Sequence, residues 1–173
     1  MRTFFPVFAV PAVLLSFSAA AQTMDVPEPV RVPSGHAMAM KALGVGEITY
    51  ECKARAADAT AFEWAFVAPV AKLVDPATNK EVGKYYAGPT WESTDGSKIT
   101  GKQVAIAPAA AGNIPLQLVK TEPAMGNGAM TGVTYIQRVN TRGGVAPANP
   151  CAAASAGMKK QVPYQAEYVF YRM

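Results

Sequence analysis

The sequence contains few of the side chains from which enzyme and metal sites are usually built. It has one histidine and two cysteines in 173 residues, and charged residues make up only 16% of the chain. A metal site needs several histidine, cysteine or carboxylate ligands at close spacing, which His36 alone cannot supply. No nucleophile elbow surrounds His36, and no complete phosphate-binding glycine fingerprint is present. We therefore expect no metal and no cofactor, and a serine triad and a nicotinamide enzyme are disfavoured.

Charge of one sign is not concentrated anywhere in the chain. There are 16 Lys and Arg against 12 Asp and Glu, for a net charge of +4. After the N-terminal segment, Lys159 and Lys160 form the only adjacent pair of cations. Nucleic-acid binding usually requires a basic stripe interleaved with aromatics, so nucleic acid is not an expected partner. The oligomeric state is not predicted by any of these features.

The longest apolar run lies at the N-terminus. Arg2 precedes an apolar stretch from Phe4 to Phe17, and three alanines that end at Ala21 form the small-residue pattern that a signal peptidase reads. The pattern predicts a cleaved signal peptide over residues 1–21. The mature chain would then be a soluble protein in the periplasm or outside the cell, without a membrane anchor, because no later apolar run is long enough to span a bilayer.

Cys52 and Cys151 are the two cysteines, and export would place them in an oxidising compartment. We predict a disulfide between them. Two buried free thiols are the alternative, and a two-cysteine metal site assisted by His36 is a poorer one.

Short segments rich in β-branched and aromatic residues dominate the rest of the chain. Residues 22–36 contain three prolines and are expected to form an extended lead-in. Residues 37–173 are expected to form one mainly antiparallel all-β domain, either a sandwich or a partly closed barrel of about eight to ten short strands with minor helical turns. The expected strands cover residues 47–53, 62–66, 72–74, 81–86, 90–93, 98–106, 114–121, 132–140 and 164–172.

The first group of candidate ligand-binding residues lies between residues 85 and 95. Tyr85 and Trp91 could form a stacking platform for a flat ligand, although aromatics at strand spacing more often belong to a core. Glu92 and Asp95 could act as a sugar-cleaving carboxylate pair. The structural alternative is that Glu92 is an outward strand residue and that Asp95 with Gly96 forms a type I′ hairpin turn.

The second group lies on the segment from Tyr135 to Gly144. Gln137 is expected on the same face as apolar neighbours, where an amide either satisfies a buried backbone group or contacts a ligand. Arg138 and Asn140 share the other face, which predicts either an anion or polar-ligand site or an exposed face of salt bridges.

Several separated motifs together resemble the exported domain-of-unknown-function family numbered 3455. They are YAGPTWE at 86–92, DGS at 95–97, YIQRVNT at 135–141 followed by two glycines, Pro147 and Cys151, and VPY at 162–164. The resemblance runs from about Pro29 to Tyr171. It implies export, a single domain and pairing of Cys52 with Cys151. The chain departs from the family pattern at Tyr85, where a histidine is common, and at Leu116, where a tryptophan is common.

The resemblance implies no activity, so the expected function comes from the residues alone. Without a complete catalytic constellation, we expect a non-catalytic binding or structural module, with a small molecule or a carbohydrate as its possible ligand. The alternative is a hydrolase or isomerase that acts on a small or carbohydrate substrate through Glu92, Asp95 or Arg138. A deep pocket that unites these three side chains would favour the enzyme.

Overall fold

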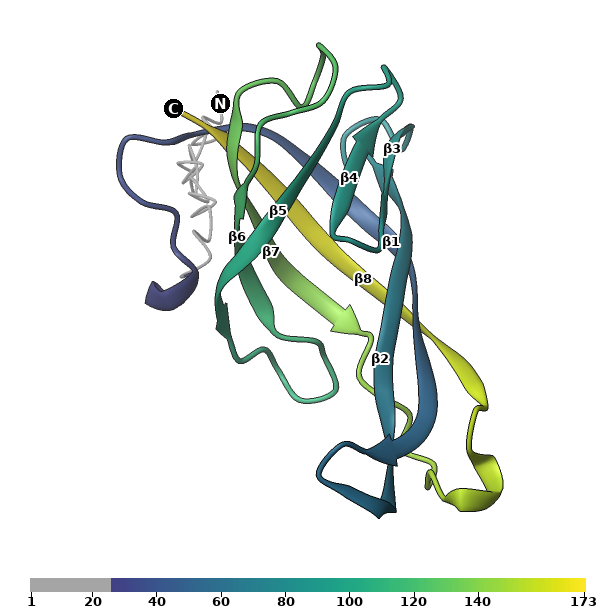
Figure 1. Cartoon of the computed structure of the whole chain (residues 1–173). Helices are drawn as coiled ribbons and strands as arrows, with labels where there is room; N and C mark the ends of the chain where they lie inside the picture. Colours follow the sequence, from purple (N-terminus) through teal and green to yellow (C-terminus); the bar gives the residue numbers. More distant parts are fainter. Residues whose placement is uncertain (1–25) are drawn as a thin grey trace, which may run out of the picture.

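Eight antiparallel strands form a barrel in the computed structural model, which describes residues 26–173 (Figure 1). The predicted signal peptide lies outside the described residues. The strands are β1 (Ala37–Arg55), β2 (Asp58–Val74), β3 (Glu81–Tyr86), β4 (Thr90–Ser93), β5 (Lys98–Ala107), β6 (Leu116–Thr121), β7 (Val133–Gly143) and β8 (Lys159–Arg172). Two single 3₁₀ turns, η1 (Glu28–Val30) and η2 (Ala153–Ser155), complete the regular structure.

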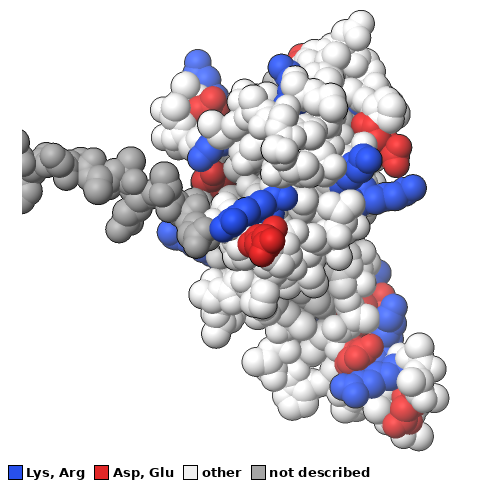
Figure 2. Space-filling view, turned by 90° about the vertical axis from the view of Figure 1, so that its left-hand side faces the viewer, with Lys and Arg blue, Asp and Glu red and all other residues white. Residues whose placement is uncertain are grey.

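The strand order follows the chain order, and β8 pairs with β1 to close the barrel. This confirms the expected all-β antiparallel fold, with the barrel and not the sandwich as the architecture. Among the described residues, no helix is long and apolar enough to cross a membrane. On the face seen in Figure 2, charged side chains of both signs are scattered among a mostly uncharged surface.

The inner face of the barrel holds the main core. Alternate residues point inward, as the period-two pattern of β1 and β8 predicts, and Ile48, Tyr168 and Phe170 are among the most buried. Gly44 is required where β1 passes Tyr168, because a Cβ atom at Gly44 would lie 2.5 Å from the Tyr168 ring. The bulky aromatics of β8 therefore pack against small residues of β1.

Two strands are longer than the sequence pattern predicts. β1 begins at Ala37 because residues 37–46 pair with β8, although this segment is rich in Ala, Gly and Met and poor in β-branched residues. The segments predicted as separate strands at 62–66 and 72–74 form the single strand β2, which continues through Pro69 opposite Ile48. The β1–β2 hairpin consequently extends beyond the barrel at the lower end of Figure 1.

Residues 26–32 of the lead-in pack against the outside of the barrel. Val30 is fully buried and forms a second apolar cluster with Ala107 and Leu118. The Gln137 amide donates a hydrogen bond of 2.5 Å to the Val30 carbonyl. The outer face of β5, β6 and β7 is therefore covered, which explains why both faces of these strands carry apolar residues.

The predicted disulfide between Cys52 and Cys151 is present, with the two Cα atoms 5.6 Å apart. Cys52 is fully buried, and its backbone also pairs with Gly157 and Met158. The bridge and these hydrogen bonds hold the connection between β7 and β8 against β1.

Candidate functional site

The barrel wall has an opening below the short β3–β4 hairpin. β3 has six residues and β4 has four, whereas β2 has 17 and β5 has ten. β2 pairs with β3 only from Val70 onward, and β5 pairs with β4 only up to Thr100. The β3–β4 hairpin ends midway along the barrel in Figure 1. The remaining parts of β2 and β5 lie on either side of the space beneath it.

A hollow of about 320 Å³ occupies this opening. Its lining comes from β2, β3, the β3–β4 turn, β5, β6 and β7, and consists of Phe66, Val67, Pro69, Tyr85, Ala87, Gly88, Pro89, Gln103, Gln117 and Arg138. Large apolar side chains on the flanking strands stay exposed here: Phe66 is 58% exposed on β2 and Ile106 is 50% exposed on β5. A mostly apolar hollow with a few convergent polar groups is the usual form of a small-molecule site.

Arg138 is the cationic group of the hollow. It lies two residues after Ile136, which points into the core, and it pairs with Gln117 across β6 and β7. Its Nε and Nη2 atoms donate to the Pro115 carbonyl at 3.2 and 2.9 Å, which fixes the plane of the guanidinium. Within residues 26–173 Arg138 makes no ion pair. The prediction of an exposed salt-bridging face is therefore wrong for Arg138, because its side chain turns inward.

Tyr85 forms the upper wall of the hollow. Its ring stacks on Trp91 with the centroids 4.8 Å apart, and only 6% of the residue is exposed. In the described part of the chain, its hydroxyl has no hydrogen-bond partner. The hydroxyl oxygen is not sealed from solvent. Because Tyr85 lines the hollow, the hydroxyl opens into it.

The charge of Arg138 acts on four buried or partly buried tyrosines. Burial raises the pKa of Tyr85, and it raises the pKa of Tyr164 to about 12. Burial also raises the pKa of Tyr50 and holds that of Tyr168 well above its ordinary value. The positive charge of Arg138 acts against the increase at all four hydroxyls. These phenols are neutral near pH 7, so they do not neutralise the cation.

Trp91 belongs to the core and is only 1% exposed. It lies behind Tyr85 and contacts Tyr168 edge-on, and its indole Nε1 has no hydrogen-bond partner in the described structure. Of the two predicted platform aromatics, Tyr85 therefore lines the hollow and Trp91 supports it from behind.

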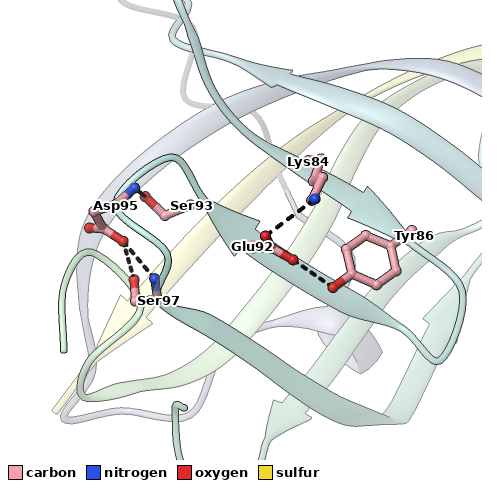
Figure 3. A network of polar contacts seen from close by, with 6 residues as sticks. All are labelled: Lys84, Tyr86, Glu92, Ser93, Asp95 and Ser97. Carbon is pink, nitrogen blue, oxygen red and sulfur yellow. Dashed lines mark hydrogen bonds and ion pairs between the residues drawn. The ribbon is translucent and has the colours of Figure 1, made fainter. Parts of the chain in front are cut away.

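Glu92 and Asp95 lie outside the hollow (Figure 3). Glu92 accepts a hydrogen bond of 2.7 Å from the Tyr86 hydroxyl and forms an ion pair of 3.2 Å with Lys84. The Tyr86 hydrogen bond and the Lys84 side chain lower the pKa of Glu92. The two carboxylates do not converge on Arg138, so the arrangement gives the hydrolase alternative no support.

Asp95 organises a turn. Its carboxylate accepts hydrogen bonds from the Ser97 hydroxyl and backbone amide, at 2.6 and 2.8 Å, and from the Ala129 amide at 2.7 Å. These bonds, led by that of the Ser97 hydroxyl, lower the pKa of Asp95 to about 2. The predicted hairpin is present, but it is not a type I′ turn, because Gly96 has a positive φ and Asp95 does not.

Gln137 and Asn140 have structural contacts outside the barrel. The Gln137 amide bonds Val30 and accepts from the Tyr171 hydroxyl, so it satisfies a buried backbone carbonyl as the structural interpretation predicts. Asn140 donates to Glu167 at 3.2 Å and has a positive φ of 51°. Neither side chain lines the hollow that contains Arg138.

A larger hollow of about 610 Å³ lies at the other end of the barrel. Much of its lining comes from the connection between β6 and β7, together with His36 and Met173. The His36 ring packs edge-on against Tyr135, and its Nδ1 lies 3.1 Å from the Pro33 carbonyl. Because Arg138 and the Tyr85 hydroxyl, which lack an ion-pair and a hydrogen-bond partner among the described residues, lie in the smaller hollow, that one is the candidate site.

Sequence reasoning identified Tyr85 and Arg138 but missed the rest of the site. Gln103 on β5 and Gln117 on β6 meet diagonally, and Gln117 donates to Gln103 at 2.6 Å. Leu116 and Leu118 point outward under the lead-in, and Gln117 between them lines the hollow. A glutamine between two leucines was the available signal.

Residues 33–172 match the model of a family described as a protein of unknown function, DUF3455. The chain belongs to the DUF3455 family. No curated protein and no solved structure matches the chain. Of the two residues at which the resemblance implied a departure, Tyr85 lies in the hollow, whereas Leu116 lies on the outside next to the lead-in. Variation at residue 85 would therefore change the candidate site directly.

Proposed function

We propose that the protein is an exported, non-catalytic binding module that takes a small molecule into the opening beneath the β3–β4 hairpin. One observation carries the proposal: a mostly apolar hollow contains an inward cation without an ion-pair partner among the described residues. Barrels of eight strands are just wide enough to be filled by side chains or to hold one small ligand. Here side chains fill the centre and leave the end open.

Export is supported by the disulfide, since such bridges form and persist mainly in oxidising compartments. The apolar segment before Gln22 supports it as well. The absence of a carboxylate from the lining supports a binding role over hydrolysis.

A direct test uses 3-phenylpropanamide, a small neutral molecule with an apolar ring, in NMR titrations. We expect weak, saturable binding to the mature protein. The Ala87→Trp variant places a bulky side chain at the exposed edge of the hollow and should weaken this binding severalfold. Ala111→Trp, in an exposed connection that does not line the hollow, serves as the matched control. Equal binding by wild type and Ala87→Trp would contradict the proposal.

A further inference from the structure

The hollow beneath the β3–β4 hairpin has a polar end and an apolar end. Arg138, Gln103 and Gln117 line the hollow from the neighbouring strands β7, β5 and β6. Phe66 and Val67 lie on the flanking strand β2 and expose apolar surface. A ligand that fills the hollow therefore meets a cation and amides with one part and apolar side chains with another.

Arg138 retains hydrogen-bonding capacity for a ligand. A guanidinium carries five N–H donors, and the contacts to the Pro115 carbonyl use Nε and Nη2. Nη1 and the second hydrogen of Nη2 have no acceptor among residues 26–173. Because the Pro115 contacts fix the side chain, little rotamer freedom is left to lose when a ligand binds.

Among residues 26–173, no anionic side chain pairs with Arg138. The groups around it are neutral phenols, amides and apolar side chains, and Glu92 is engaged with Lys84 and Tyr86 on the outside. A charge in a partly enclosed, low-dielectric site attracts an opposite charge more strongly than one on open surface. The Tyr85 hydroxyl adds a neutral donor at the same hollow.

From this arrangement we infer that the ligand is a small organic monoanion, a carboxylate with an apolar body, whose carboxylate pairs with Arg138 and whose apolar part packs against Phe66. The inference rests on the proposed binding function and names the ligand class of the same site. A planar carboxylate matches the paired donors of a guanidinium. The apolar body accounts for the exposed aromatic ring at the opening, which a small inorganic anion would leave exposed.

The test compares 3-phenylpropanoate with 3-phenylpropanamide, which has nearly the same shape and no charge. Calorimetry or NMR titration of the mature protein should show the carboxylate binding about tenfold tighter, as expected for charge-assisted hydrogen bonds. Arg138→Gln should remove this preference while the amide still binds. Arg138→Lys should keep part of the preference, because it retains the charge without the paired donors.

Arg142→Gln is the matched control, because Arg142 is an exposed residue of the same strand, does not line the hollow and carries the same charge. It should leave both affinities unchanged. Tyr85→Phe should weaken carboxylate binding severalfold without lowering the melting temperature, since the hydroxyl has no partner in the described protein to lose. This variant keeps the test informative if Arg138→Gln folds poorly.

The outcomes separate the two claims. Binding of the amide with no preference for the carboxylate would overturn the inference and leave the binding function standing. Binding of neither compound would overturn both. A preference that persists in Arg138→Gln but disappears in Arg142→Gln would place the anion site elsewhere and overturn the inference.

Discussion

Gln117 and Arg138 are register partners on β6 and β7, and both line the hollow at the open end of the barrel. Further along the same strands, the inward pair is Val119 and Ile136, which are both buried in the core. The inner face therefore changes from apolar to polar within two residues. A polar pair is tolerated on this face because the wall is open there and the groups keep access to solvent or to a ligand.

The disulfide should make a large contribution to stability. It closes a loop with a sequence separation of 99 residues between Cys52 and Cys151. We expect the Cys52→Ser, Cys151→Ser double variant to lose about 2 to 4 kcal/mol of unfolding free energy, because the unfolded chain gains the freedom that the cross-link removes. Urea unfolding of both proteins measures this loss. An unchanged midpoint, or two titratable thiols per chain in unfolded, unreduced wild type, would contradict the account.

Gln137 should attach the lead-in to the barrel. Its amide is the hydrogen-bond donor to the buried Val30 carbonyl, and Gln137 is itself 3% exposed. Gln137→Ala leaves that carbonyl without its partner and should cost about 1 to 3 kcal/mol. The lead-in should also become sensitive to limited proteolysis before the barrel does, because it loses an anchor. Gln165→Ala, at an exposed position of β8, is the control and should change neither property.

Asp95 should make the protein less stable in acid. Its pKa is lowered to about 2 in the folded state from an ordinary value of 3.8, so the unfolded chain takes up the proton first as the pH falls. The stabilising contribution is complete above the unfolded value and is lost as the pH falls from about 4 towards about 2. Melting temperatures across this range should fall more steeply for wild type than for Asp95→Asn. Parallel curves for the two proteins would rule out this role of Asp95.

The strands with strong β signals could be predicted from the sequence. β3 and β4 have the expected bounds, because both are short alternating segments between clear turns. The first ten residues of β1 could not be predicted, since Ala and Gly have low β propensity, and only the packed structure shows that Gly44 makes room for Tyr168. The continuity of β2 through Pro69 was missed because proline usually marks the end of a strand.

The site could be predicted only in part. Tyr85 and Arg138 stood out as polar or aromatic residues in strands, but the sequence does not show that they face the same space from β3 and β7. The opening arises from the difference in length between β3–β4 and the strands beside them, which depends on strand pairing. The outward leucines of β6 depend on the cover that the lead-in provides, which no local pattern reveals.

The location of the bound ligand tests the central claim most directly. Two-dimensional NMR of ¹⁵N-labelled protein that begins at Gln22, titrated with 3-phenylpropanoate, reports which backbone amides and which arginine Nε–H groups contact the ligand. The account predicts saturable shifts that cluster at Phe66, Tyr85, Gln117 and the Nε–H of Arg138. Shifts that cluster instead around His36 and the connection between β6 and β7 would contradict it, as would a spectrum that does not change.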